Sequence, residues 1–297
     1  MQPKPFHGVL TALVTPFSKD EKPHIAELQA LIRTQIEAGV HGLVLSGTTG
    51  EGATLTDCEQ LSILETAVHE TNQQVPILVG TSSNDTAHVQ ILARQACEAG
   101  ADALMVLTPY YNRPSQEGLY QHFAKIAEAS TTPMLIYSNP IRCGISIDIA
   151  TIARLRAAYP HIVGIKETFN SVDRFTAIVQ ELGSEFILLA GDDNMALPAY
   201  ALGAHGIVSA TANLIPKTII DIWMAAQKND FETARTLHYR YFPLFTALST
   251  ETNPCPIKHA LAHCGNIESS RVRLPLSPLS LENAQTLEKA LQELGLC

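Results

Sequence analysis

Lys166 ends an apolar segment, residues 162–166 (Ile-Val-Gly-Ile-Lys), and simple packing does not account for a cation there. Segments of Ile, Val and Gly are typical of strands that are buried on both faces in a parallel sheet. Poor solvation at the end of such a strand favours the neutral form of an amine. A neutral amine can form a Schiff base with a carbonyl substrate, which turns a ketone into an electron sink. The simpler alternative is a lysine that extends into solvent or pairs with a carboxylate.

The alternation of side chains along a strand predicts the surroundings of this lysine. Ile162, Gly164 and Lys166 should share one face, with Val163 and Ile165 on the other. Because glycine has no side chain, we expect Gly164 to leave open space beside the lysine.

Tyr137 ends the preceding predicted strand, so its phenol and the Lys166 amine can face the same substrate. A tyrosine there can relay protons while a carbinolamine forms and loses water. Taken alone, Tyr137 is better explained as a core aromatic residue whose hydroxyl is hydrogen-bonded.

Three loops after predicted strands carry further polar groups. In residues 46–52, glycines and the hydroxyls of Thr48 and Thr49 could bind a small anion such as a carboxylate, although a glycine-rich turn also explains them. Tyr110 and Tyr111 form an exposed pair, which indicates a contact. Arg142 could bind a second carboxylate through two hydrogen bonds, although many loop arginines are simply solvated.

Eight short β-branched segments alternate with helical periodicity, which predicts an α/β fold of the (β/α)8 TIM barrel type. In such a barrel the chemistry lies at the carboxyl ends of the strands. We expect residues 1–225 to form the barrel domain and 226–297 an α-helical extension. The predicted strands are 8–14, 42–46, 75–79, 103–107, 134–137, 162–166, 186–190 and 206–209, with helices at 24–38, 56–70, 84–99, 115–130, 147–157, 171–182 and 194–202.

Composition narrows the class of protein. Hydrophobic residues make up 46% and charged residues 16% of the 297, as in a compact globular enzyme. The net charge of −9 and the absence of a basic cluster argue against a nucleic-acid partner. No apolar stretch is long enough for a membrane span, and residues 1–14 lack a secretory signal pattern. The six cysteines have no metal-binding spacing, so we expect reduced thiols in a cytoplasmic protein.

The motifs together resemble those of the dihydrodipicolinate synthase family of pyruvate-dependent class I aldolases. The likeness spans nearly the whole chain, and its motifs are Gly47-Thr48-Thr49-Gly50-Glu51, Tyr110-Tyr111-Asn112-Arg113-Pro114, Tyr137 with Arg142, Gly164-Ile165-Lys166-Glu167, Gly191-Asp192-Asp193 and Asn253-Pro254-Cys255-Pro256-Ile257-Lys258.

The resemblance implies a role for each matching residue. Lys166 would form the Schiff base with pyruvate, and Tyr137, Thr48 and Tyr111 would relay protons, with Tyr111 reaching into a neighbouring subunit. Thr48 and Thr49 would hold the pyruvate carboxylate, Arg142 would bind L-aspartate 4-semialdehyde, and the Val208 carbonyl would face the site. The product would be 4-hydroxy-tetrahydrodipicolinate, made for diaminopimelate and lysine biosynthesis by a homotetramer of two tight dimers without a cofactor.

The family also implies a feedback site for lysine at a subunit interface. His88 stands where sensitive members carry Glu, and neither form of a histidine supplies an anion for an ammonium group. We therefore predict weak or absent inhibition by lysine, with Asp57 as a partial substitute. The matching positions are Gly52, Ala53, Asp57, Gln60, Asn84, His88 and Tyr110.

Other enzymes remain possible on the same scaffold. N-acetylneuraminate lyase and 2-keto-3-deoxy-sugar acid aldolases share the lysine and the tyrosine, but Arg142 and the paired threonines favour the synthase. We expect no catalytic metal, because His205 stands alone and Asp192 and Asp193 are more simply explained as caps of the next helix.

Overall fold

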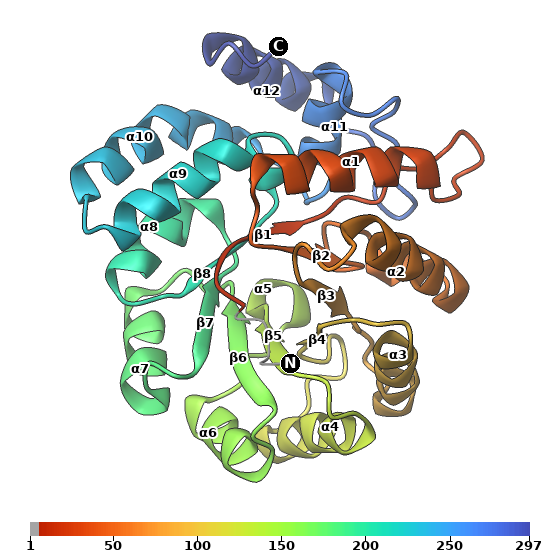
Figure 1. The fold of residues 1–297 in the computed structure, drawn as a ribbon, viewed down its shortest axis with the longest axis vertical. Helices are drawn as coiled ribbons and strands as arrows, with labels where there is room; N and C mark the ends of the chain where they lie inside the picture. The colour runs from red at the N-terminus through yellow and green to blue at the C-terminus, as the bar shows by residue number, and fades with distance from the viewer. Residues whose placement is uncertain (1–5) are drawn as a thin grey trace.

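The computed structural model describes residues 6–297, and its centre is a closed barrel of eight parallel strands paired in chain order (Figure 1). Residues 1–5, which begin the predicted barrel domain, lie outside the described residues. The barrel confirms the predicted fold class. Its strands are β1 (Gly8–Ala12), β2 (Gly42–Leu45), β3 (Ile77–Gly80), β4 (Ala103–Leu107), β5 (Met134–Ser138), β6 (Ile162–Glu167), β7 (Ile187–Ala190) and β8 (Gly206–Ser209).

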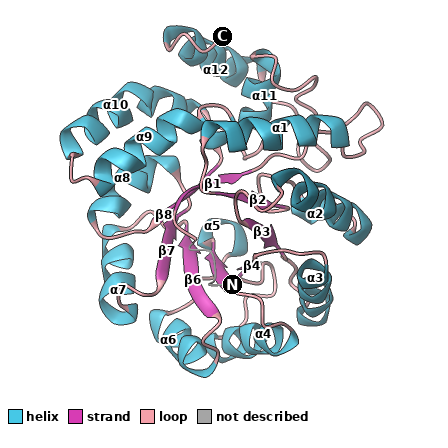
Figure 2. Ribbon diagram, in the orientation of Figure 1, coloured by secondary structure: helices cyan, strands magenta, loops and turns pink. Residues whose placement is uncertain are grey.

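Helices surround the barrel on its outer side (Figure 2). All seven predicted helices are present within a few residues of the expected bounds, and Thr56 and Glu59 form the predicted capping box of α2. The short α5, which carries Arg142, is an element that we do not predict. The helices are α1 (Ile25–Ala38), α2 (Asp57–Thr71), α3 (Thr86–Glu98), α4 (Gln116–Ala129), α5 (Pro140–Cys143), α6 (Ile149–Ala158), α7 (Val172–Leu182), α8 (Asp193–Ala201), α9 (Pro216–Gln227), α10 (Phe231–Ala247), α11 (Cys255–His263) and α12 (Leu281–Glu293), with 3-10 turns at Gly52–Thr54 and Thr211–Asn213.

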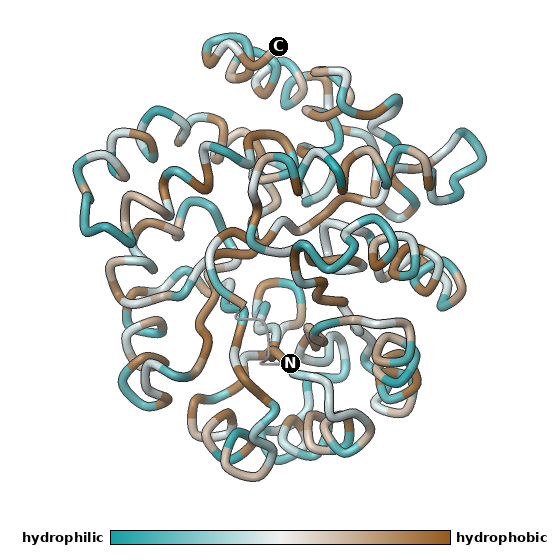
Figure 3. The backbone as a smooth tube through the Cα atoms, in the orientation of Figure 1, coloured by the Kyte–Doolittle hydropathy of each residue, from teal (hydrophilic) through white to brown (hydrophobic). Residues whose placement is uncertain are grey.

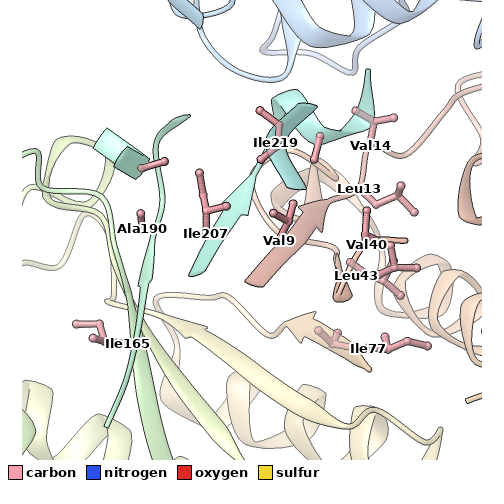
Figure 4. Close-up of a cluster of buried hydrophobic side chains, with 14 of the residues drawn as sticks. Val9, Leu13, Val14, Val40, Leu43, Ile77, Ile165, Ala190, Ile207 and Ile219 are labelled. Carbon is pink, nitrogen blue, oxygen red and sulfur yellow. The ribbon is translucent and has the colours of Figure 1, made fainter. Parts of the chain in front are cut away.

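Two apolar layers hold the barrel together. The outer layer lies between strands and helices and includes Val9, Leu43, Ile165 and Ile207 (Figure 4). A smaller layer fills the barrel interior, with Leu135, Tyr137 and Val208 among its members. Strands buried on both faces need mostly apolar side chains, and much of the tube in the barrel is accordingly brown in Figure 3.

A register shift in β6 changes the side-chain alternation. The pairing with β5 runs from Met134 opposite Ile162 to Leu135 opposite Gly164, so Val163 has no partner of its own. Val163 consequently packs against the inner layer, whereas Ile162 and Ile165 both lie in the outer layer. Our prediction that Ile162 shares a face with Lys166 and Val163 one with Ile165 was therefore wrong.

The C-terminal helices cover one side of the barrel. The helix α10 packs against α8 and α9, and α12 packs against α10 and α11, as Figure 1 shows at the end of the chain. The predicted division at residues 225 and 226 falls in the last turn of α9 and stays a prediction.

The cysteines are not all reduced. Cys264, at the end of α11, forms a disulfide with Cys297, and the Cα atoms of this pair are 5.2 Å apart. Our prediction of six free thiols was wrong for this pair, because two cysteines far apart in sequence give no local signal of their proximity. Cys58, Cys97, Cys143 and Cys255 are free.

Within residues 6–297, none of the helices combines the length and the apolar character needed to cross a membrane.

Candidate active site

A polar cavity of about 300 Å³ opens at the carboxyl ends of the barrel strands. Six of the predicted site residues share it, and the C-terminal extension closes one side of it. Its walls include Thr48, Thr49, Tyr137, Asn139, Arg142, Lys166, Gly191, Asp192, Asp193, Val208, Asn253 and Ile257.

Lys166 projects into this cavity from β6, and its side chain is nearly buried, with 6% of the residue exposed. The strand register places it opposite Tyr137 of β5, as predicted. The Lys166 Nζ lies 4.1 Å from the centre of the Tyr137 ring. Amine and phenol are therefore close enough to act on the same substrate atom.

The glycine that makes room for this lysine is Gly191 and not Gly164. A Cβ atom at Gly191 would lie 3.1 Å from Cε of Lys166 and would clash with Thr168 at 2.2 Å. A Cβ atom at Gly164 would instead meet Ile187 at 2.5 Å, so no open space exists there. Our prediction failed because the strand β7, which fills the space at Gly164, is distant in sequence.

Tyr137 has two hydrogen-bond partners. Its phenol oxygen accepts a hydrogen bond of 2.9 Å from Nδ2 of Asn139, and it lies 3.3 Å from Oγ1 of Thr48. Burial raises the pKa of Tyr137, but the charge of Lys166 and the two hydrogen bonds outweigh burial, so its pKa is below the ordinary value. The phenol is thus better prepared to give up its proton than a free tyrosine is.

Asn139 is a site residue to which we assigned no function from the sequence. Its side-chain oxygen accepts from the backbone N–H of Arg142 and so caps α5, while its Nδ2 binds Tyr137. One carboxamide therefore holds both the relay tyrosine and the loop of the candidate carboxylate-binding arginine. The Asn-Pro pair at the start of a short helix was the available signal.

Thr49 is oriented by the C-terminal extension. Nδ2 of Asn253 donates a hydrogen bond of 2.9 Å to Oγ1 of Thr49. Because that oxygen accepts from Asn253, the proton of the threonine hydroxyl is left for another acceptor, such as a carboxylate in the cavity.

Arg142 lies at the cavity wall with its side chain exposed. Its Nη2 donates a hydrogen bond of 3.1 Å to the carbonyl oxygen of Asn253. Within residues 6–297, Asn253 is the one hydrogen-bond partner of this guanidinium, so its remaining donors are able to bind an anionic group.

A buried ion pair lies beneath the threonine loop. Nζ of Lys258 lies 2.6 Å from Oε1 of Glu51, and both side chains are almost completely buried. The backbone N–H of Arg273 donates to the other oxygen of Glu51, and Lys258 also donates to the carbonyl of Arg271. Glu51 belongs to the motif of Thr48 and Thr49, so the pair attaches their loop to the C-terminal extension.

The two aspartates after β7 do not cap α8 with their side chains, contrary to our prediction. The carboxylate of Asp193 accepts hydrogen bonds from the hydroxyls of Ser209 at 2.6 Å and of Thr211 at 2.8 Å. Asp192 faces the cavity, and burial raises its pKa although Lys166 opposes this effect. Asp193 therefore holds the end of β8 by hydrogen bonds, while Asp192 contributes a carboxyl group to the cavity.

Tyr111 does not join the cavity of its own chain. It is 89% exposed and has a φ angle of 69°, a value that non-glycine residues adopt only when the loop imposes it. Among the described residues, Tyr137 and Thr48 are the members of the predicted relay that lie together.

The candidate lysine-effector residues separate into neighbouring groups. Gly52, Ala53 and Tyr110 line a largely apolar cavity of about 250 Å³ that also touches Arg142. Nε2 of His88 lies 3.0 Å from the carboxylate of Asp57. The remaining contacts run from Gln60 to the carbonyl of Gly52 and from Asn84 to Asn112.

Comparisons with known proteins identify the family of this chain. Residues 5–294 match the model of the dihydrodipicolinate synthetase family. A curated 4-hydroxy-tetrahydrodipicolinate synthase from Methanopyrus kandleri is 42% identical, covering 97% of this chain and 96% of its own. Another from Persephonella marina is 40% identical over 98% and 99% of the two chains.

Solved structures give the same result. The 4-hydroxy-tetrahydrodipicolinate synthase of Methylacidiphilum fumariolicum SolV superimposes with a TM-score of 0.96 at 38% identity, covering 98% of this chain and 96% of that one. The similarity therefore includes the barrel, its loops and the C-terminal helices. On these grounds the chain belongs to the dihydrodipicolinate synthetase family.

Proposed function

We propose that this protein catalyses the Schiff-base aldol condensation of pyruvate with L-aspartate 4-semialdehyde to give 4-hydroxy-tetrahydrodipicolinate. The observation that carries the proposal is the nearly buried Lys166, 4.1 Å from the Tyr137 ring, in a cavity with hydroxyl groups on one side and Arg142 on another. Relatives about 40% identical over nearly the whole chain bear the synthase name.

The first half of the reaction forms an enamine. Nζ of Lys166 attacks C2 of pyruvate, and the carbinolamine loses water to give the imine. Tyr137 and Thr48, which are 3.3 Å apart, would move the protons that this dehydration needs. Loss of a C3 proton then converts the imine to the nucleophilic enamine, while Thr48 and Thr49 hold the carboxylate.

The second half forms the ring. The enamine C3 attacks the aldehyde carbon of L-aspartate 4-semialdehyde, whose carboxylate Arg142 binds, and the aldehyde oxygen takes a proton. The amine of the adduct then attacks the imine carbon and displaces Lys166, so that one water is released for each pair of substrates. The free lysine re-enters the cycle.

We further propose that Tyr111 completes the relay of a neighbouring subunit in a homotetramer of two tight dimers. Its 89% exposure and its absence from the cavity of its own chain support this role. A cytoplasmic location and a place in diaminopimelate and lysine biosynthesis follow from the same proposal.

The test of the reaction measures turnover with both substrates. Purified protein is mixed with pyruvate and L-aspartate 4-semialdehyde, and NADPH loss is followed through added dihydrodipicolinate reductase. We expect turnover that depends on both substrates and is lost in Lys166→Ala. A folded protein that traps pyruvate with borohydride but shows no such turnover would contradict the proposal, and cleavage of N-acetylneuraminate would then identify the alternative lyase.

Mixed subunits test the role of Tyr111. If the proposal holds, Lys166→Ala and Tyr111→Phe subunits should each be nearly inactive alone, whereas a mixed dimer contains one site with Lys166 from one chain and Tyr111 from the other. We expect activity to return on mixing. If it does not return although mixed dimers form, Tyr111 acts within its own chain or not at all.

A further inference from the structure

Two histidines and a glutamate, none of which lines the catalytic cavity, converge between α11 and α12. His259 and His263 lie four residues apart on α11, so their rings share one face of the helix. The ring planes are 17° apart and the centroids 6.3 Å apart. Figure 1 shows the two helices adjacent at the end of the chain.

Both imidazoles face one oxygen of Glu288. Nε2 of His259 lies 2.8 Å from Oε1 of Glu288, and Nδ1 of His263 lies 3.5 Å from the same atom. The three potential ligand atoms lie within 4.8 Å of one another. Among residues 6–297, neither imidazole has a hydrogen-bond or ion-pair partner besides this carboxylate.

A simple surface ion pair uses only part of this arrangement. One carboxylate oxygen can be hydrogen-bonded well by His259, but His263 at 3.5 Å is then left with a weak contact. A cation between the three groups would instead engage all of them. In a tetrahedral zinc site with bonds of about 2.0–2.2 Å, the ligand atoms are about 3.4 Å apart, which is close to the separation of His263 and Glu288.

We propose that His259, His263 and Glu288 bind one Zn²⁺ ion between α11 and α12. Two imidazoles and one carboxylate are a donor set that zinc takes in proteins, and three protein ligands leave a fourth position for water. The side chains are 24%, 38% and 36% exposed in that order, so the ion can enter from solvent and keep that water. The contact of 2.8 Å between Nε2 of His259 and Oε1 of Glu288 would lengthen when the ion binds.

The zinc site would give a second link between α11 and the C-terminal part of the chain. Cys264 follows His263 directly, and its disulfide with Cys297 already joins the end of α11 to the chain end. A zinc ion would add a link from α11 to the middle of α12. Metal that binds the folded chain preferentially stabilises it.

The experiment measures zinc binding by the full-length protein after treatment with a chelator. Calorimetric titration with ZnCl₂ should show one bound ion per chain and a rise in the thermal unfolding temperature. Glu288→Gln and His263→Gln should each lower the association constant by more than the roughly 10- to 100-fold that loss of an outer-shell partner costs. Gln retains side-chain size and helix propensity, so unfolding curves without zinc should match the wild type.

Two controls separate this site from adventitious binding. His69→Gln removes an exposed histidine of α2 that lies 3.9 Å from Glu70, and it should leave zinc binding unchanged. Cys58→Ser/Cys97→Ser removes the exposed free thiols and should also leave it unchanged. Zinc held by those thiols would be lost in the second control and retained in Glu288→Gln.

Anomalous diffraction at the zinc edge from crystals soaked in ZnCl₂ gives the position of the ion. A peak between His259, His263 and Glu288 is the expected result. Failure of the wild-type protein to bind zinc, unchanged binding in the Glu288→Gln/His263→Gln double variant, or a peak elsewhere would overturn the proposal.

Discussion

The amide group of Asn139 donates a hydrogen bond of 2.9 Å to the phenol oxygen of Tyr137, while the same side chain caps the helix that carries Arg142. A phenol has one proton to donate. Because its oxygen accepts from Asn139, that proton is free to point to Thr48, 3.3 Å away. Asn139 therefore sets the direction in which the relay can pass a proton.

Replacing Asn139 tests this direction. We expect Asn139→Asp, which keeps the helix cap but loses the donor, to lower kcat by about 10-fold, the equivalent of one hydrogen bond of roughly 1.4 kcal/mol. The donor helps to hold the pKa of Tyr137 below its ordinary value, so its loss should move the alkaline limb of the kcat/KM profile to higher pH. An unchanged profile together with unchanged kcat would remove Asn139 from the relay.

Arg142 should bind L-aspartate 4-semialdehyde and should not be needed for the reaction with pyruvate. We expect Arg142→Leu to lower kcat/KM for L-aspartate 4-semialdehyde by about 10- to 100-fold, as for loss of a charge-assisted hydrogen bond, and to leave borohydride trapping of pyruvate intact. Arg154→Leu, an exposed arginine of α6 paired with Glu117, is the matched control. Equal loss of both activities would instead indicate that the variant disturbs the whole site.

Removing one partner of the ion pair between Lys258 and Glu51 should destabilise the fold, because the other charge is then buried without a partner. Lys258→Met leaves a buried carboxylate without its cation, and we expect it to destabilise the fold by about 3–5 kcal/mol. Adding Glu51→Gln should recover part of this loss, because the uncompensated charge is then gone. Denaturant unfolding of the two single variants and the double variant measures the coupling, and strictly additive effects would contradict it.

Inhibition by lysine should be weak or absent. His88 already pairs with Asp57, so the carboxylate that could have substituted for a missing glutamate is engaged. A steady-state titration with L-lysine checks this, and a sub-millimolar inhibition constant would show the prediction to be wrong. His88→Glu should increase the sensitivity if this position limits it.

A count of reactive thiols tests the Cys264–Cys297 disulfide. Unfolded, unreduced protein should show four reactive thiols, from Cys58, Cys97, Cys143 and Cys255. Its closed loop of 33 residues corresponds to a stabilisation of about 3–4 kcal/mol in the chain-entropy model, which reduction should remove. Six reactive thiols would contradict the disulfide and agree with our sequence-based prediction of a fully reduced chain.

The sequence predicts the barrel well because each buried strand carries its own signal. Apolar segments of four to seven residues, separated by amphipathic helices, identify all eight strands, and the position of Lys166 at the end of one of them leads to Tyr137 on the neighbouring strand. These inferences need only the local pattern of apolar residues and the fact that parallel strands end on the same side of the barrel.

Contacts between distant segments account for what we did not predict. Glu51 and Lys258 are 207 residues apart, and no local pattern indicates that they meet. The same holds for the space beside Lys166, which depends on Gly191 of the next unit, and for the face of Val163, which depends on a register shift. To predict each of these features, the relative positions of two elements must be known.

Asn253 touches both candidate anion-binding residues, since its carboxamide donates to Thr49 and its carbonyl accepts from Arg142. The two substrates would thus share one support, supplied by a segment outside the barrel. A shift of Arg142 would therefore be transmitted through Asn253 to Thr49. Displacement of the segment around Asn253 would therefore disturb both candidate anion-binding residues together.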